Sequence, residues 1–274
     1  MKKHLPTIII ILLLLAGLSL MLYPTVSNWW NSFHQSRAIV TYMDRVAALD
    51  SETYGKLLSE AKEYNMSLLE NPKRFEMTES ERAAYNKLMD ISGNGIMGYI
   101  EIPSIRCTLI IYHGTEEANL QIAAGHLEGS SLPIGGENTH CVVTGHRGLP
   151  SAKLFTNLDQ LKKGDVFFLY VLEDTLAYEV DQILVVEPED ISALDIEAGK
   201  DLCTLVTCTP YGINSHRLLI RGRRIFDWAK TESEPDIRTE EYISPMPVLI
   251  GAVAGILILT VCVCIWFIKK KKRK

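Results

Sequence analysis

A β-branched run that ends in a cysteine has the clearest chemical potential in the chain. It reads Thr204-Leu205-Val206-Thr207-Cys208-Thr209-Pro210, and Arg217 opens the next apolar run. The pattern predicts a hairpin, in which the residues that close one strand and open the next lie at the same edge. We therefore expect Cys208 and Arg217 to face each other across the loop mouth. Cys203 should point to the opposite face, because side chains alternate along a strand.

A thiol at such a rim can act as a nucleophile when a neighbouring group helps it to ionise, since an ordinary cysteine titrates near ~8.5. An imidazole is suited to this, because it exchanges protons near neutral pH. His146 is favoured among the histidines, since it follows an apolar run and lies between Gly145 and Gly148 on a sterically open turn. His140 begins the same run and belongs at its far end, and His216 should alternate to the face opposite Arg217.

Each of these residues also has an ordinary structural interpretation. A strand cysteine is more often part of the core than a nucleophile, a turn histidine is usually solvated, and a strand arginine usually pairs with a surface carboxylate. The spacing alone leaves the catalytic and the structural interpretations open.

Short β-branched runs dominate the chain after Gly95, separated by clusters of Gly, Pro, Asn or Asp. Seven or eight strands of this kind indicate a closed β-barrel or a sandwich. The strands are expected at 97–102, 108–112, 140–144, 166–172, 177–186, 204–208 and 218–225, and 151–161 is expected to be helical.

The region before Gly95 has a helical period. Apolar residues recur at three- and four-residue steps from Ser36 to about Leu69, which predicts one helix. Thr78 and Glu81 have the spacing of a capping box, so a second helix should begin there and run to about Met89. These helices would form an N-terminal arm.

Two uncharged apolar segments, 5–23 and 247–268, are long enough to cross a membrane. Lys2 and Lys3 flank the first, and the basic tail 269–274 follows the second, so the positive-inside rule places both termini in the cytoplasm. The first segment is expected to be an uncleaved anchor rather than a signal peptide, because its apolar run is too long for one and no small-residue cleavage site follows.

The charge distribution follows the same division. Eight of the 28 Lys and Arg residues lie at the two termini and none of the 33 Asp and Glu residues do, which leaves a net charge of −13 on the outer segment. So acidic a surface argues against nucleic-acid binding. An apolar content of 47% with 22% charged residues excludes a disordered chain. The cysteines show no zinc-site spacing.

The run 204–208 with Arg217 resembles the signature of the sortase family, a Thr-Leu-x-Thr-Cys strand followed by an arginine on the next strand. The stretches 125–133, which includes Gly-His-Leu-Glu-Gly, and 144–155, Thr-Gly-His-Arg-Gly-Leu-Pro-Ser-Ala-Lys-Leu-Phe, resemble its class C, or pilin-polymerising, branch. The resemblance covers roughly residues 36–225 and both apolar segments.

The resemblance implies an eight-stranded sortase-type β-barrel with a helical N-terminal arm, flanked by two transmembrane helices. The implied organisation is a cytoplasmic N-terminus (1–4), a transmembrane helix (5–23), a helical arm with the lid candidate (24–95), the catalytic barrel (96–228), a juxtamembrane linker (229–246), a transmembrane helix (247–268) and a basic cytoplasmic tail (269–274). The catalytic domain would be extracellular, on a Gram-positive surface.

The resemblance also implies a role for each matched residue. Cys208 would attack an LPXTG-like sorting signal and form a thioester, His146 would be the acid/base partner, and Arg217 would stabilise the charged oxygen. Thr207 would help to position the substrate. The partners would be pilin or surface proteins with such a signal, the acceptor a lysine of a pilin subunit, and no cofactor or metal is implied.

Two alternatives stay open at this point: a sortase that anchors surface proteins to cell-wall peptide amines, and a non-catalytic receptor ectodomain. One departure from class C concerns the lid, a loop that commonly carries an Asp-Pro-aromatic motif. The equivalent segment here, Asn71-Pro72-Lys73-Arg74-Phe75-Glu76, lacks that tripeptide, and Phe75 is the candidate plug.

Overall fold

The fold is known from a computed structural model, which describes residues 5–227 and residue 251. The chain divides into two compact units, one made of Met1–Trp29 and Ser233–Lys274 and the other of Trp30–Glu232. The second unit contains the barrel and the helical arm, and it carries all the candidate site residues.

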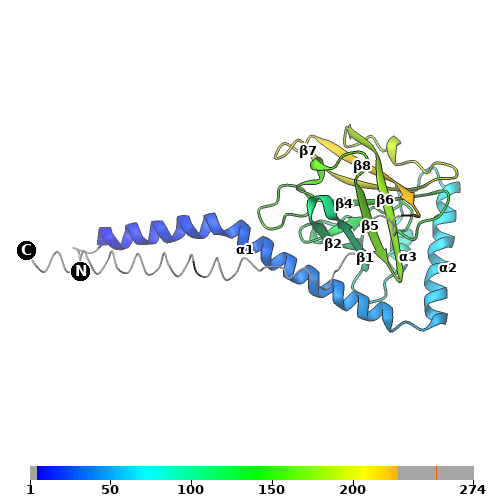
Figure 1. Ribbon diagram of the computed structural model, residues 1–274, viewed down its shortest axis with the longest axis horizontal. Coiled ribbons are helices and arrows are strands. Elements are labelled where there is room, and N and C mark those ends of the chain that lie inside the picture. The colour runs from blue at the N-terminus through cyan, green and yellow to red at the C-terminus, as the bar shows by residue number, and fades with distance from the viewer. Residues whose placement is uncertain (1–4, 228–250, 252–274) are drawn as a thin grey trace, which may run out of the picture. The chain divides into compact units, whose positions relative to one another are not determined.

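Eight strands close into a barrel in the order β1-β2-β3-β4-β7-β8-β6-β5 (Figure 1). All neighbouring pairs are antiparallel except β2–β3 and β4–β7. The strands are β1 (Ile96–Ile102), β2 (Cys107–His113), β3 (Ala124–His126), β4 (Thr139–Gly145), β5 (Val166–Val171), β6 (Asp174–Val186), β7 (Asp201–Thr209) and β8 (His216–Ile225).

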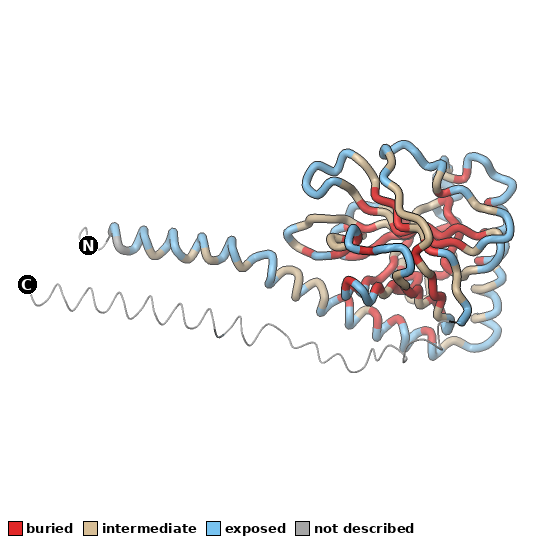
Figure 2. Tube along the Cα trace, turned by 45° about the horizontal axis from the view of Figure 1, so that its top comes forward, coloured by how far each residue is buried: buried red, intermediate tan, exposed pale blue. Residues whose placement is uncertain are grey.

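The barrel interior is filled by alternate residues of the strands, as the apolar/polar alternation predicts. Phe167, Leu169, Cys203, Leu205 and Ile220 are all fully buried in one core cluster. Figure 2 shows this core as the buried centre of the strands. Each of the seven predicted strands is confirmed to within a few residues, and β3 was missed because three residues are too short to show a period.

The predicted helical arm is confirmed, but its first helix is not one piece. Helix α1 (Leu5–Ala47) ends before residues 48–50, and α2 (Ser51–Ser67) starts after Asp50, whose side chain accepts a hydrogen bond from the Thr53 amide. Thr78 caps α3 (Glu79–Tyr85) with the predicted capping box. Short helical turns complete the chain: η1 (Leu68–Glu70), η2 (Pro103–Ile105), α4 (Glu117–Leu120), η3 (Leu158–Gln160) and η4 (Ser192–Leu194).

The prediction of a helix over 151–161 is wrong. Only η3 is helical there, because Leu154 has a φ of 39°, a left-handed conformation that interrupts a right-handed helix. The segment instead turns back on β4 through a hydrogen bond from the Phe155 amide to the His146 carbonyl. Leu154, Leu158 and Leu161 are buried nonetheless.

The arm is fastened to the barrel by buried polar side chains. Tyr42 of α1 donates to the Met97 carbonyl at 2.9 Å and accepts from the Leu172 amide at 2.8 Å. Asn65 of α2 makes two hydrogen bonds with the backbone of Leu132. Figure 1 shows α2 running along one side of the barrel. These contacts hold the arm and the barrel together as one body.

The first apolar segment lies within α1. Ile8–Ala47 of this helix is the only stretch in the described part of the chain that is long and apolar enough to span a membrane. This agrees with a membrane anchor or a signal sequence. The second expected span (247–268), except for residue 251, lies outside the described residues, as do residues 1–4, residue 228 at the end of the expected barrel domain, the linker (229–246) and the tail (269–274).

Candidate active site

Cys208 and Arg217 face each other across the β7–β8 hairpin, as the sequence predicts. The two residues are direct partners in the antiparallel register. Cys208 is partly exposed, whereas Cys203 on the same strand is fully buried in the barrel core. The alternation therefore places Cys208 on the outer face of the barrel.

His146 follows Gly145, the last residue of β4, which runs parallel to β7. Thr144, two residues before His146, is paired with Val206, two residues before Cys208. Positions 146, 208 and 217, which we call the row, thus lie at the same end of the barrel, on or just after three adjacent strands.

Thr207 joins the two strands that carry this row. Its side chain is only 1% exposed, and its hydroxyl donates a 2.8 Å hydrogen bond to the carbonyl of Gly145. Thr207 immediately precedes Cys208, and Gly145 immediately precedes His146. The hydroxyl is used inside the protein, so any effect of Thr207 on a substrate must act through the neighbouring backbone.

The Arg217 guanidinium is held by the loop between β7 and β8. Its Nη1 donates to the carbonyl of Asn214 at 3.3 Å and to that of His216 at 3.2 Å. The Nε2 atom of His216, which the sequence places on the opposite face, lies 3.2 Å from Oε1 of Glu187 instead. A guanidinium fixed in this way is a permanent positive charge beside the thiol.

The His146 imidazole contacts a carboxylate that the sequence analysis did not single out. Its Nε2 lies 3.1 Å from Oε2 of Glu117, which belongs to α4. A hydrogen bond from Gln121, and then the one with His146, hold the pKa of the Glu117 carboxyl below its usual range. Nothing in the local pattern distinguishes Glu117 from its neighbour Glu116, because only the fold brings α4 to His146.

Arg147 was also missed. Its side chain is almost buried, pairs with Asp159, and lies 3.5 Å from the Thr209 hydroxyl. Its guanidinium carbon lies 5.6 Å from the centre of the Tyr211 ring. The Arg147 side chain therefore connects the end of the His146 segment to Thr209, the residue after Cys208, and to Tyr211 in the β7–β8 loop.

The lid candidate lies on the outer face of the strands that carry the row. Phe75 packs against an apolar cluster that includes Val142 of β4, Val206 of β7 and Leu219 of β8. These side chains point outward, as Cys208 does, because they alternate with residues of the barrel core. Phe75 is therefore placed on the same surface as the thiol.

Arg74 fastens this segment to the loop between β6 and β7. Its guanidinium donates to the Leu194 carbonyl at 3.0 Å and pairs with Asp195 at 3.3 Å. The same guanidinium lies 4.7 Å from the centre of the Phe75 ring, within the range of a cation–π contact. The segment is thus held by a charged side chain and an aromatic one together.

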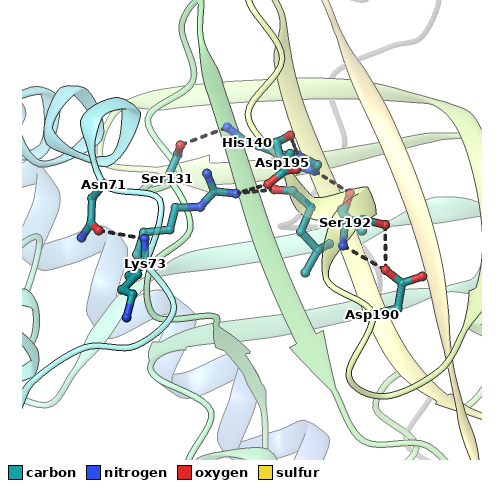
Figure 3. Close-up of polar contacts among 10 residues, drawn as sticks. Asn71, Lys73, Ser131, His140, Asp190, Ser192 and Asp195 are labelled. Atoms are coloured by element: carbon teal, nitrogen blue, oxygen red, sulfur yellow. Dashed lines mark hydrogen bonds and ion pairs between the residues drawn. The ribbon is translucent and has the colours of Figure 1, made fainter.

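His140 contacts the same loop at Asp195 (Figure 3). One ring nitrogen is 2.8 Å from the Asp195 carbonyl, and the other is 2.7 Å from the Thr204 hydroxyl. Burial lowers the pKa of His140 below its ordinary value. Figure 3 shows His140 and Asp195 between the 71–73 segment and the Asp190–Ser192 turn, and these contacts are structural.

The remaining described histidines do not belong to the row. His126 is fully buried and hydrogen-bonded to the Tyr85 hydroxyl at 2.7 Å, and His113 is also buried. The four cysteines among residues 5–227 are all free thiols. That part of the chain also has no cluster of three His, Cys, Asp or Glu side chains placed to hold a metal ion.

Comparisons with known proteins identify the fold. Residues 100–225 match the model of the sortase domain. The crystal structure of sortase C1 from Streptococcus agalactiae is 51% identical, covers 70% of this chain and 99% of that one, and has a TM-score of 0.64. Sortase C1 of GBS Pilus Island 1 is 41% identical, with coverage of 73% and 96% and a TM-score of 0.65.

A curated relative, sortase D of Bacillus subtilis (strain 168), is 31% identical over 131 residues. That match covers 47% of this chain and 63% of the relative, so this chain spans less than two thirds of its length. Because the likeness to sortase C1 extends over nearly all of that solved chain, this protein belongs to the sortase family of cysteine transpeptidases, with class C sortases as its structural neighbours.

Proposed function

We propose that this protein is a membrane-anchored transpeptidase that polymerises pilins. In this proposal it cleaves an LPXTG-like sorting signal through a thioester and transfers the acyl group to a lysine amine of another pilin subunit. The observation that carries the proposal is the row of a thiol, an imidazole and a guanidinium at one end of the barrel. The likeness to a sortase C1 from a pilus island supports pilin as the substrate class.

The residues divide the chemistry in a way that their properties support. The Cys208 sulfur attacks the carbonyl carbon of the Thr–Gly bond while His146 takes the thiol proton, and negative charge develops on the carbonyl oxygen. Arg217 stabilises that oxygen, because its guanidinium stays protonated and cannot act as a base. When the C–N bond breaks, His146 gives a proton to the departing glycine amine, which leaves a thioester on Cys208.

The second half reverses the proton transfer. A lysine amine attacks the thioester carbon and loses a proton to His146, the C–S bond breaks as the isopeptide bond forms, and His146 returns the proton to the departing sulfur. Thr207 supports both halves indirectly, because it fixes the backbone before His146 to the backbone before Cys208.

The apolar helix within α1 serves as the membrane anchor in this proposal. With the span expected over 247–268, both termini would be cytoplasmic and the barrel extracellular. Substrates with membrane-anchored tails would then share the same surface, which raises their effective concentration without any new contact.

The experiment uses the full-length chain in detergent micelles with a candidate pilin that carries a sorting signal. High-mass ladders on a denaturing gel are expected with the wild type and absent with Cys208→Ala, and hydroxylamine should release the thioester intermediate. Arg217→Lys should lose most of the activity, since an ammonium lacks the planar fork. Ladders that persist in Cys208→Ala contradict the proposal, and attachment only to short cell-wall peptide amines would favour the anchoring activity instead.

A further inference from the structure

Glu117, which lies on none of the three strands that lead to the row, contacts the imidazole of His146. The Oε2 atom of Glu117 lies 3.1 Å from Nε2 of His146, and the imidazole is 26% exposed while the carboxylate is 68% exposed. Glu117 belongs to α4, which precedes β3, so the contact joins a fourth element to the row.

The carboxylate is itself held in place. Its other oxygen, Oε1, accepts a hydrogen bond from the Gln121 side chain, one helical turn further along the chain. The short helix is fastened to the barrel by Leu120, which is buried, and by Asn119, whose side chain donates to the His113 carbonyl at 3.1 Å. Gln121, Glu117 and His146 thus form a chain of contacts that starts on an anchored element.

We propose that Glu117 is a positioning residue for His146, an inference that rests on the proposed function. The Nε2–H of the neutral ring donates to the carboxylate, which selects one tautomer and one ring orientation. Nδ1 is then the basic nitrogen that is free to exchange a proton during the reaction. A carboxylate that orients a catalytic imidazole in this manner acts through the histidine and does not touch the reacting atoms.

The chain provides a matched control in Glu116. This residue carries the same charge, precedes Glu117 directly, is exposed, and makes no side-chain hydrogen bond at the start of α4. Glu116→Gln therefore removes an equal charge from the same place without removing the contact with His146. It separates the effect of the contact from the effect of local charge.

The kinetic test measures kcat and KM of the full-length chain in detergent with a sorting-signal peptide. Glu117→Ala is expected to lower kcat about three- to fivefold, the size expected for the loss of one hydrogen bond, with KM unchanged. Glu117→Gln keeps an acceptor oxygen at the same reach and should lose less, and Glu116→Gln should match the wild type. A wild-type kcat in Glu117→Ala overturns the proposal, as does an equal loss in Glu116→Gln.

A second readout does not depend on turnover. Nitrogen chemical shifts of labelled histidine report the tautomer of His146, assigned with His146→Gln, at a pH at which the ring is neutral. The Nε2–H tautomer is expected to dominate in the wild type and in Glu116→Gln, and to lose its excess in Glu117→Ala. An identical tautomer ratio in all three proteins contradicts the proposal even if kcat falls.

The same experiments distinguish this proposal from the proposed function. Turnover that survives in Cys208→Ala or His146→Ala refutes the catalytic roles themselves. Turnover that is abolished in both but unchanged in Glu117→Ala refutes only the positioning role.

Discussion

Thr207 links the backbone beside two candidate catalytic residues through one buried hydroxyl. Its hydrogen bond to the Gly145 carbonyl connects β7 and β4 one residue before Cys208 and one before His146. Thr207→Val keeps the shape of the side chain and removes the donor. We expect it to lower the free energy of unfolding by about 1 kcal/mol, the net value of one hydrogen bond.

The same substitution should lower kcat more than it raises KM, because it loosens the spacing of the residues proposed to be catalytic. Urea unfolding and peptide kinetics measure the two effects. Thr207→Ser retains the hydroxyl and should restore the activity. Failure of serine to do so would point to a role for the methyl group rather than for the hydrogen bond.

For single residues, the sequence indicated which side chains are candidates for chemistry but not which side chains they contact. The alternation in 204–208 was enough to place Cys208 on the outer face and Cys203 in the core. Glu117 and Arg147 could not be found in the same way, since each meets its partner only after distant segments have folded together.

Among the contacts between structural elements, those of Arg147 are the most important for the site, because they join the segments on which His146 and Cys208 lie. Removing its guanidinium breaks the ion pair with Asp159 and the contacts with Thr209 and Tyr211. We expect Arg147→Met to cost about 1–2 kcal/mol of stability, as for a charge-assisted hydrogen bond with a partly hydrated partner. Activity should fall further than stability alone explains.

Arg147→Lys is the control, because it keeps the charge but cannot bridge several partners at once. Its melting temperature and kcat should lie between those of the wild type and Arg147→Met. If Arg147→Met is destabilised but fully active, then the two loops are positioned by other contacts.

The lid candidate also depends on contacts between elements. Phe75 packs on the outward face of β4, β7 and β8, the face to which Cys208 also belongs. We therefore expect Phe75→Ala to expose that surface and to raise the hydrolysis rate of a sorting-signal peptide. Phe226→Ala, at a ring that is 80% exposed near the end of β8, is the control and should leave the rate unchanged.

An unchanged rate in Phe75→Ala would remove the lid function of this residue. Asp195→Asn is an independent probe, because it weakens the contact that Arg74 makes with the β6–β7 loop. It should raise the hydrolysis rate in the same direction, by less, since the Leu194 carbonyl remains as an acceptor.

Element boundaries were predictable where a side chain signals them and not elsewhere. The capping box at Thr78 was recognised, whereas Asp50 caps α2 without a reciprocal Glu or Gln and the apolar period continues across it. The left-handed conformation of Leu154 has no counterpart in the sequence, because leucine rarely adopts it.

The whole molecule should lose stability in mild acid, and His140 is one reason. Burial holds the pKa of its ring below the ordinary value of 6.5, so the folded chain resists a proton that the unfolded chain accepts. The contribution is complete above pH 6.5 and is lost as the pH falls from there through the lowered pKa. Burial shifts the pKa of His113 in the same direction, so the two effects add.

The prediction is tested by urea unfolding of the wild type and of His140→Gln. The measurements run from about pH 7.5 to about pH 5, the range in which histidines titrate. The free energy of unfolding should fall less steeply with acid in the variant, because glutamine does not titrate. Equal slopes would mean that His140 has the same proton affinity in the folded and unfolded chains.

The closed barrel was the most predictable feature of the whole molecule: the β-branched alternation and the turn residues indicated a barrel or a sandwich, and the sortase-like motifs favoured the barrel. The membrane topology was predictable as an expectation, and within the described residues one apolar helix agrees with it. What the sequence did not provide is the set of contacts between segments, which depend on strand order.

The register of the barrel determines which kinds of change the protein tolerates. Because positions 146, 208 and 217 form a row only through the pairing of β4, β7 and β8, deleting one residue within any of these strands would turn a functional side chain toward the core. The loops at 187–200 and 210–215 lie outside the strand register, but Leu194 and Asp195 in the first and Tyr211 and Asn214 in the second contact side chains around the row. Grafts intended to alter peptide preference therefore belong in the other residues of those two loops, with the length of every strand left as it is.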